Sequence, residues 1–134
     1  MTPSAGRPLV LVVDDDRDTR EMYGFFLDAE GLDVITAPDA ATAFELAVAR
    51  QPRAVVTDLF LPGGTTGLDL CRQLHGDSRT AHIPALLLTG SARDGEVDRA
   101  RAAGCAEVRF KPILPEQLVS DLRTLIGGAG AHGR

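Results

Sequence analysis

No stretch of this chain is long and apolar enough to cross a membrane. A spanning helix needs about 20 consecutive apolar residues, and the longest hydrophobic runs of the sequence are far shorter. The first eight residues also lack the apolar core of a secretory signal peptide. We therefore expect no membrane contact and predict a cytoplasmic protein.

Basic residues are outnumbered by acidic ones. The sequence has 14 Lys and Arg against 19 Asp and Glu, for a formal net charge of −5. Because nucleic-acid-binding domains present a basic stripe, we do not expect this chain to bind nucleic acid directly. Its 134 residues, 44% of them hydrophobic and 25% charged, are typical of one globular domain with a real core.

Cysteine is scarce. Cys71 and Cys105 are the only two, they lie among apolar or small residues, and they lack CxxC spacing. We interpret them as buried or half-buried free thiols rather than as disulfide partners or metal ligands. The three histidines, His75, His82 and His132, are scattered, and we expect them in loops or on the surface without a metal role.

Apolar runs of strand type alternate five times with runs of helix type. Strands are expected at 9–13, 33–36, 54–57, 85–88 and 107–110, and helices at 17–30, 40–51, 68–74, 94–103 and 115–126. Alternation of this kind predicts right-handed crossovers and a parallel sheet covered on both faces. We predict an α/β protein, a three-layer α/β/α sandwich whose five-stranded sheet has the flavodoxin-like order 2-1-3-4-5. Residues 1–8 are expected to be a disordered arm, 9–126 the domain and 127–134 a flexible tail.

Helical spacing predicts which side chains face the core. In the first helix, four apolar residues fall at the i, i+3, i+4, i+7 spacing of a buried face: Met22, Phe25, Phe26 and Ala29. The last helix carries an apolar stripe of Leu118, Leu122, Leu125 and Ile126. Asp16 and Asp39 precede the first two helices and are expected to cap them.

Charged residues follow three of the predicted strands. The first ends on Asp14-Asp15-Asp16, the central one ends on Asp58, and the last is followed by Lys111. Since ligands bind at the carboxyl ends of the strands in such sheets, we expect these side chains to meet. Three carboxylates at one edge repel each other, by about 4 kcal/mol for a pair at 4 Å and an effective dielectric near 20, so the cluster needs a cation.

Oxygen ligands without nearby cysteine or histidine favour Mg²⁺ or Mn²⁺ over zinc. An alternative remains, in which Asp14, Asp15 and Asp16 only stabilise the positive end of the first helix. The glycine-rich residues 63–67 lack the GK[ST] of a P-loop, and we interpret them as a flexible loop rather than a phosphate cradle.

Four segments together resemble the signatures of receiver domains of two-component response regulators. They are VVDDD at 12–16, TDLFLP at 57–62, LTG at 88–90 and FKP at 110–112, and the resemblance covers roughly residues 9–126, nearly the whole chain. It implies that Asp58 accepts a phosphoryl group from a phosphohistidine of a sensor histidine kinase or a phosphotransfer protein. It also implies a Mg²⁺ site with Asp15 as main ligand, Asp14 holding the ion through water, and Asp58 and the Phe60 backbone carbonyl completing the set.

The resemblance further implies that Lys111 neutralises phosphoryl oxygens and that Thr89 is a switch hydroxyl. A cis peptide bond is expected at Lys111-Pro112. The protein would act as a single-domain response regulator that switches binding to an unidentified protein partner. Its only reactions would be its own phosphorylation and dephosphorylation, with no outside metabolite turned over.

The sequence departs from the family at three places. Val108 stands where an aromatic ring usually swings with the threonine, so we expect signalling through Thr89 and backbone shifts alone. The loop after Pro62 is one residue longer than usual. Phe60 and Ser91 lie two residues beyond the acceptor and the threonine, and we expect bulky Phe60 to shield the acyl phosphate from water.

Two other functions are considered. Val108 is compatible with a receiver-like module that binds a partner without phosphorylation. An aspartate-nucleophile phosphatase needs a D-x-D-x-[TV] loop after its first strand, and residues 14–20 lack Thr or Val at the fifth position of either possible match. The phosphatase is therefore disfavoured.

Overall fold

The computed structural model describes residues 6–90 and 95–130, and within these ranges strands and helices alternate strictly. The strands are β1 (Leu9–Val13), β2 (Asp33–Ala37), β3 (Ala54–Asp58), β4 (Ala85–Thr89) and β5 (Glu107–Phe110). The helices are α1 (Arg17–Ala29), α2 (Ala40–Arg50), α3 (Gly67–His75), α4 (Glu96–Ala102) and α5 (Pro115–Gly130).

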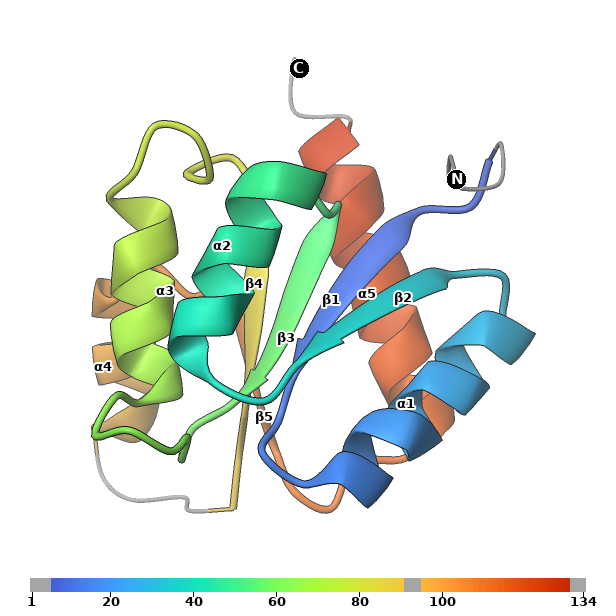
Figure 1. The fold of residues 1–134 in the computed structure, drawn as a ribbon, viewed down its shortest axis with the longest axis horizontal. Coiled ribbons are helices and arrows are strands. Elements are labelled where there is room, and N and C mark those ends of the chain that lie inside the picture. Colours follow the sequence, from blue (N-terminus) through green and yellow to red (C-terminus); the bar gives the residue numbers. More distant parts are fainter. Residues whose placement is uncertain (1–5, 91–94, 131–134) are drawn as a thin grey trace.

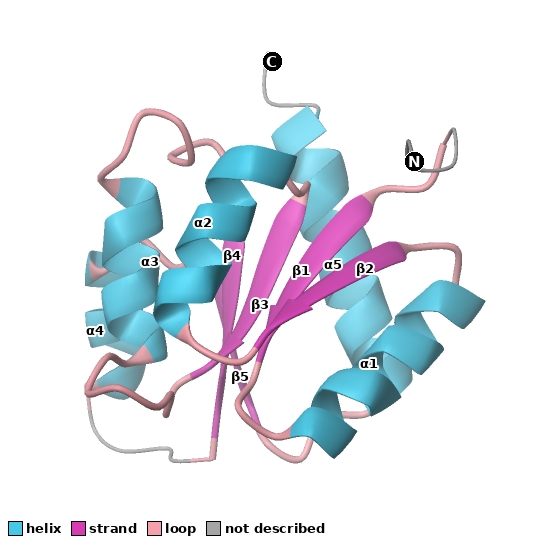
Figure 2. Cartoon of the chain, viewed as in Figure 1, coloured by secondary structure: helices cyan, strands magenta, loops and turns pink. Residues whose placement is uncertain are grey.

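The five strands form one parallel sheet in the order β2-β1-β3-β4-β5, as predicted. The central register pairs Val12 with Thr36 of β2 on one side and with Val56 of β3 on the other. All strand arrows in Figure 2 therefore run the same way, and their carboxyl ends gather at one edge of the sheet.

The sheet lies between two layers of helices (Figure 1). Alternate strand residues point to opposite faces, so Leu11, Val13 and Leu87 pack against α2, α3 and α4. Val12 and Val56 pack with α1 and α5 on the other face. The three-layer sandwich is confirmed. The predicted stripe of α5 is confirmed with it, with Leu118, Leu122 and Ile126 buried and Leu125 packed at the margin.

The predicted buried face of α1 is wrong. Tyr23 and Leu27 are buried, whereas Met22, Phe25 and Phe26 are 45%, 75% and 39% exposed. Ala29 is exposed as well. The sequence of α1 carries two overlapping apolar stripes, and periodicity alone does not choose between them. The short connection from β1, with Asp16 capping α1 by accepting a hydrogen bond from Thr19 N, sets the rotation of the helix.

Part of each expected terminal segment takes part in the fold where it is described. Arg7, expected in a disordered arm, donates hydrogen bonds to Asp33 (2.8 Å) and Asp28 (2.7 Å). Residues 127–130, expected in a flexible tail, continue α5. Residues 1–5 and 131–134, the expected helix start at Asp94, and Ser91 lie outside the described residues.

Two local predictions are confirmed. Asp39 caps α2, with its carboxylate accepting a hydrogen bond from Thr42 N at 2.8 Å. The Lys111-Pro112 peptide bond is cis.

In the loop after Pro62, Gly63 and Gly64 both adopt positive φ, of 85° and 76°, a conformation that other residues rarely take. No helix within the described ranges has the length and apolar character that a bilayer crossing requires.

Candidate functional site

The acidic residues predicted to meet do so at the carboxyl edge of the sheet. Asp14 follows β1 directly, and its backbone N–H donates to Ala37 O at 3.1 Å, which holds the strand end in place. Asp58 is the last residue of the neighbouring strand β3. One carboxylate oxygen from each of Asp14, Asp15 and Asp58 lies within 4.8 Å of the others. Residues 14 and 58 thus come together because β1 and β3 are adjacent.

Lys111 reaches the same cluster from β5. Its Nζ lies 3.1 Å from Asp58 Oδ1, and its backbone N–H donates to Thr89 O at 2.8 Å. The same Asp58 oxygen accepts a hydrogen bond from Leu59 N at 2.9 Å. Lys111 is the only lysine of the sequence. An ammonium group therefore offsets part of the negative charge at this edge.

Burial makes the ionised form of one acid costly. Asp14 is only 5% exposed. Its burial raises the pKa of Asp14, the charges of Asp58 and Asp15 raise it further, and the Asp16 N–H and Lys111 oppose the shift without cancelling it. Burial likewise raises the pKa of Tyr23, whose phenol senses the charges of Lys111, Asp14 and Asp58. A bound cation would relieve this electrostatic penalty.

The donor set fits a hard divalent cation. It consists of carboxylates only, from the buried Asp14, the exposed Asp15 and the half-buried Asp58. Mg²⁺ prefers oxygen ligands and keeps several waters, which suits a cluster open on the side of Asp15. Within the described residues, no other group of His, Cys, Asp and Glu side chains has this arrangement.

Thr89 ends β4 beside this edge, and its side chain is fully buried. Its hydroxyl donates to Glu96 Oε1 at a long 3.4 Å. Glu96 is itself buried and pairs with Arg99 Nη2 at 3.3 Å. Glu96 could not be singled out from the sequence, because its burial depends on how α4 packs.

Phe60, two residues past Asp58, has a side chain 66% exposed, and its backbone forms a β-bridge with Thr66. Val108 is buried among aliphatic and small side chains next to α3 and α4. The site thus has an exposed ring near the acceptor and no ring at 108.

The start of α3 packs on the backbone of Asp58, which the sequence reading missed. Gly67 N donates to Leu59 O at 2.7 Å, and a Cβ at position 67 would lie 2.2 Å from Asp58 O. Thr66 and Asp69 form a capping box in which each side chain accepts a hydrogen bond from the other's backbone N–H. The T-x-x-D spacing at 66–69 was a usable sequence signal for this helix start.

Comparison with known proteins agrees with this geometry. The family model of the response regulator receiver domain matches residues 10–123. The phosphate regulon transcriptional regulatory protein PhoB of Pseudomonas aeruginosa is 31% identical over 121 residues, which are 90% of this chain and 52% of that protein. The DNA-binding response regulator MtrA of Mycobacterium tuberculosis is 34% identical over 117 residues, 87% of this chain and 50% of that protein. The chain spans about half the length of these curated relatives.

Among solved structures, the chemotaxis response regulator CheY4 of Vibrio cholerae superposes with a TM-score of 0.81 at 27% identity, covering 89% of this chain and 98% of that chain. The family match at residues 10–123 thus includes the parallel sheet, apart from its first residue, Leu9, and the acidic residues at its carboxyl edge. The chain belongs to the family of response regulator receiver domains.

Proposed function

We propose that this domain accepts a phosphoryl group on Asp58 from a phosphohistidine of a sensor histidine kinase or phosphotransfer protein, in a Mg²⁺-dependent reaction in the cytoplasm. The observation that carries the proposal is the convergence of Asp14, Asp15, Asp58 and Lys111 at one edge of the sheet. A domain of this family is a signalling switch, so the only chemistry we assign to it is its own phosphorylation and dephosphorylation.

The transfer is a displacement at phosphorus. A carboxylate oxygen of Asp58 forms the new P–O bond while the P–N bond to the donor histidine breaks, and the imidazole leaves with its electron pair. Lys111 Nζ, already 3.1 Å from the carboxylate, is placed to neutralise the incoming phosphoryl oxygens. Such reactions depend mainly on positioning and charge neutralisation, which this edge provides.

Asp14, Asp15, Asp58 and the Phe60 carbonyl are the proposed Mg²⁺ ligands, with Asp14 acting through a water. The cation would supply positive charge against both the clustered carboxylates and the transferred group. The raised pKa of Asp14 supports this assignment, because the buried carboxylate is destabilised without a cation.

Thr89 is the proposed link to the output surface. Its hydroxyl, now directed at Glu96, would turn toward the phosphoryl group and shift a two-state equilibrium toward a form that binds a protein partner. Val108 offers no ring to rotate with it, so the signal would pass through Thr89 and backbone shifts of α4 and α5. Unchanged NMR spectra of α4 and α5 upon phosphorylation would contradict this route.

A second candidate function is a module that binds its partner without phosphorylation. The aliphatic packing of Val108 favours it, since the usual Thr/aromatic coupling is absent.

We further propose that this chain itself does not contact nucleic acid, because its net charge is −5. The relative MtrA is a DNA-binding response regulator about twice as long as this chain, so any such output would belong to other parts of a regulator.

Incubation with acetyl phosphate and Mg²⁺, followed by intact mass spectrometry, tests the proposal. Wild type should gain about 80 Da, and Asp58→Asn should not. Asp18→Asn, which removes an exposed acid of α1, is the matched control and should be phosphorylated normally. EDTA should abolish the gain. Phosphorylation of Asp58→Asn to the wild-type extent would exclude Asp58 as acceptor, and an unmodified wild type would favour the binding module.

The exposed Phe60 gives a separate test of dephosphorylation. We propose that its bulk slows the access of water to the acyl phosphate, so Phe60→Asn should shorten the phosphoryl lifetime. The decay of the mass shift after removal of acetyl phosphate measures it, and an unchanged decay would contradict the shielding role.

A further inference from the structure

The two cysteines, far apart in sequence, lie against each other in the fold. Cys71 is on α3, and Cys105 lies between α4 and β5. Their Sγ atoms are 2.9 Å apart, both residues are buried (1% and 6% exposed), and both are free thiols. The prediction of buried free thiols is thus confirmed, but their contact was not expected. A disulfide requires about 2.05 Å between sulfurs, so the pair needs to close by only roughly 0.9 Å.

Gly104 permits this approach. It has φ +96°, and a Cβ there would lie 2.6 Å from Cγ of His75 on α3. Cys105 N donates to Ala100 O at 3.0 Å, which fixes the residue at the end of α4. The backbone of α3 holds Cys71 and the end of α4 holds Cys105, so the contact between the two thiols does not depend on a flexible loop.

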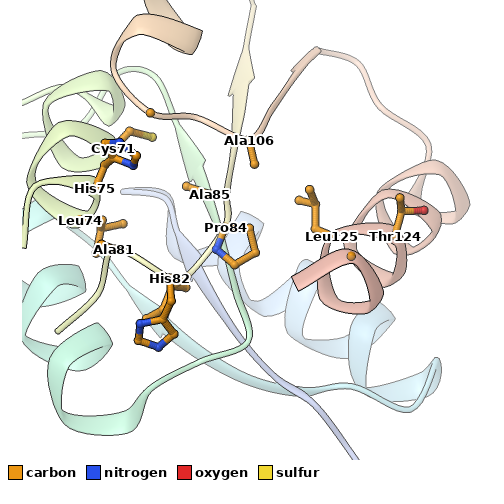
Figure 3. A pocket seen from close by; sticks show the side chains of 13 residues that line it. Cys71, Leu74, His75, Ala81, His82, Pro84, Ala85, Ala106, Thr124 and Leu125 are labelled. Carbon is orange, nitrogen blue, oxygen red and sulfur yellow. The ribbon is translucent and has the colours of Figure 1, made fainter. Parts of the chain in front are cut away.

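A pocket of about 700 Å³ is lined by Cys71, one member of the pair. It lies at the amino end of β4, where Pro84 and Ala85 line it, and so at the opposite end of the sheet from Asp58. Figure 3 shows Cys71 and His75 on one side of it and Thr124 and Leu125 of α5 on the other. Gly104 and Ala106, which flank Cys105, line it too. A small polar oxidant can thus reach Cys71 without unfolding of the domain, and Cys105 Sγ lies 2.9 Å from Cys71 Sγ.

The surroundings favour ionisation of one member. The contact with the Cys71 thiol lowers the pKa of Cys105, burial opposes this shift, and the positive charge of Arg72 adds to it, whereas the same contact and burial raise the pKa of Cys71. A thiolate is the reactive form of cysteine, and a neighbouring thiol can resolve its oxidation product.

We propose that Cys71 and Cys105 form a site of reversible oxidation by hydroperoxides, which converts the thiol pair into an intramolecular disulfide. The Cys105 thiolate attacks one peroxide oxygen, an S–O bond forms, the O–O bond breaks, and hydroxide leaves and takes up a proton. Cys71 then attacks the sulfenic sulfur, the S–S bond forms, and the S–O bond breaks with loss of water. Two thiols and one hydrogen peroxide thus give one disulfide and two waters.

The disulfide would connect two elements that both lead to the carboxyl edge of the sheet. α3 begins at Gly67, against the backbone of Asp58, and the segment after Cys105 becomes β5, which is followed by Lys111. Closing a loop between residues 71 and 105 restricts the unfolded chain and should raise the Tm of the oxidised protein by about 10 °C. The inference does not depend on phosphoryl transfer.

The test treats fully reduced protein with an equimolar amount of hydrogen peroxide, blocks remaining thiols with N-ethylmaleimide, and measures intact mass. Wild type should lose two hydrogens, about 2 Da, and take up no maleimide. Trypsin should then release residues 54–72 joined to residues 102–109. Dithiothreitol should restore both thiols and lower the Tm again. Cys71→Ser and Cys105→Ser should form no intramolecular bond and show no rise in Tm.

Oxidation in denaturant separates a built site from two thiols that meet by chance. The folded protein should form the bond at least tenfold faster than the unfolded chain, because the sulfurs already touch. Slower oxidation of the folded protein would overturn the proposal. So would a product in which single cysteines gain oxygen without the joined peptides, or a bond found only between two molecules.

Discussion

Replacing Lys111, the only lysine of the sequence, by methionine removes an ammonium group from the acidic edge and keeps a side chain of similar length. At the observed 3.1 Å, the attraction between Lys111 Nζ and Asp58 Oδ1 is about 5 kcal/mol at an effective dielectric of 20 and about 1.3 kcal/mol in bulk water. The lysine side chain is 35% exposed, so water screens the pair strongly. We therefore expect Lys111→Met to lower the free energy of unfolding by about 1–2 kcal/mol, or the Tm by roughly 3–6 °C.

Mg²⁺ should change the size of this effect. A divalent cation would replace the lost positive charge, so the difference in Tm between wild type and Lys111→Met should shrink when Mg²⁺ is added. Calorimetric melting of both proteins, with EDTA and with saturating Mg²⁺, measures it. In an Asp58→Asn background, Lys111→Met should cost much less, because its partner is already neutral.

Arg53→Met is the control, since it removes an equal charge from an exposed residue before β3. It should leave the response to Mg²⁺ as in wild type. If Lys111→Met lowered the Tm equally in the wild-type and Asp58→Asn backgrounds, or if Mg²⁺ left the loss unchanged, the electrostatic reasoning would be refuted. Lys111 would then stabilise the domain through packing.

Three further changes test the surroundings of the site. Gly67→Ala should destabilise the domain by about 1–3 kcal/mol in urea unfolding and slow its phosphorylation, because the new methyl group would overlap Asp58 O. Gly24→Ala is the control: Gly24 lies in α1 with open space around it, so this change should be neutral or stabilising. Thr66→Ala should cost about 0.5–2 kcal/mol through the lost cap, seen in the same titration. Hydrogen bonds from Arg79 lower the pKa of Asp77 from 3.8 to about 2. The ionised Asp77 carboxylate therefore stabilises the folded state fully above pH 3.8, and this contribution is lost as the pH falls through about 2. The difference in Tm between wild type and Asp77→Asn should shrink over that range and stay constant between pH 5 and 7.

The strands and the acidic edge were predictable because both follow from local sequence. The buried strands β1, β3 and β4 are apolar runs that end at, or directly before, a polar residue, and the sheet order places the end of β1 beside that of β3. The meeting of Asp14 with Asp58 follows from these two facts. The capping of α1 and α2 by Asp16 and Asp39 follows from residue type and position.

Contacts that depend on the rotation and docking of helices were not predictable in this way. The rings of Phe25 and Phe26 have the right spacing for a core face, yet the rotation of α1 turns them outward. Likewise, the bond from Thr89 to Glu96 and the meeting of Cys71 with Cys105 depend on where α3 and α4 pack. No local pattern encodes these positions, because they result from packing between segments distant in sequence.

The buried phenol on α1 has a practical consequence. Tyr23 is the only tyrosine, and the chain has no tryptophan, so ultraviolet emission excited at wavelengths that phenylalanine does not absorb comes from one known position. That position lies close enough to Asp14, Asp58 and Lys111 to sense their charges. We therefore expect cation binding or phosphorylation at the sheet edge to change the intrinsic fluorescence of the native chain, which needs no dye or engineered label.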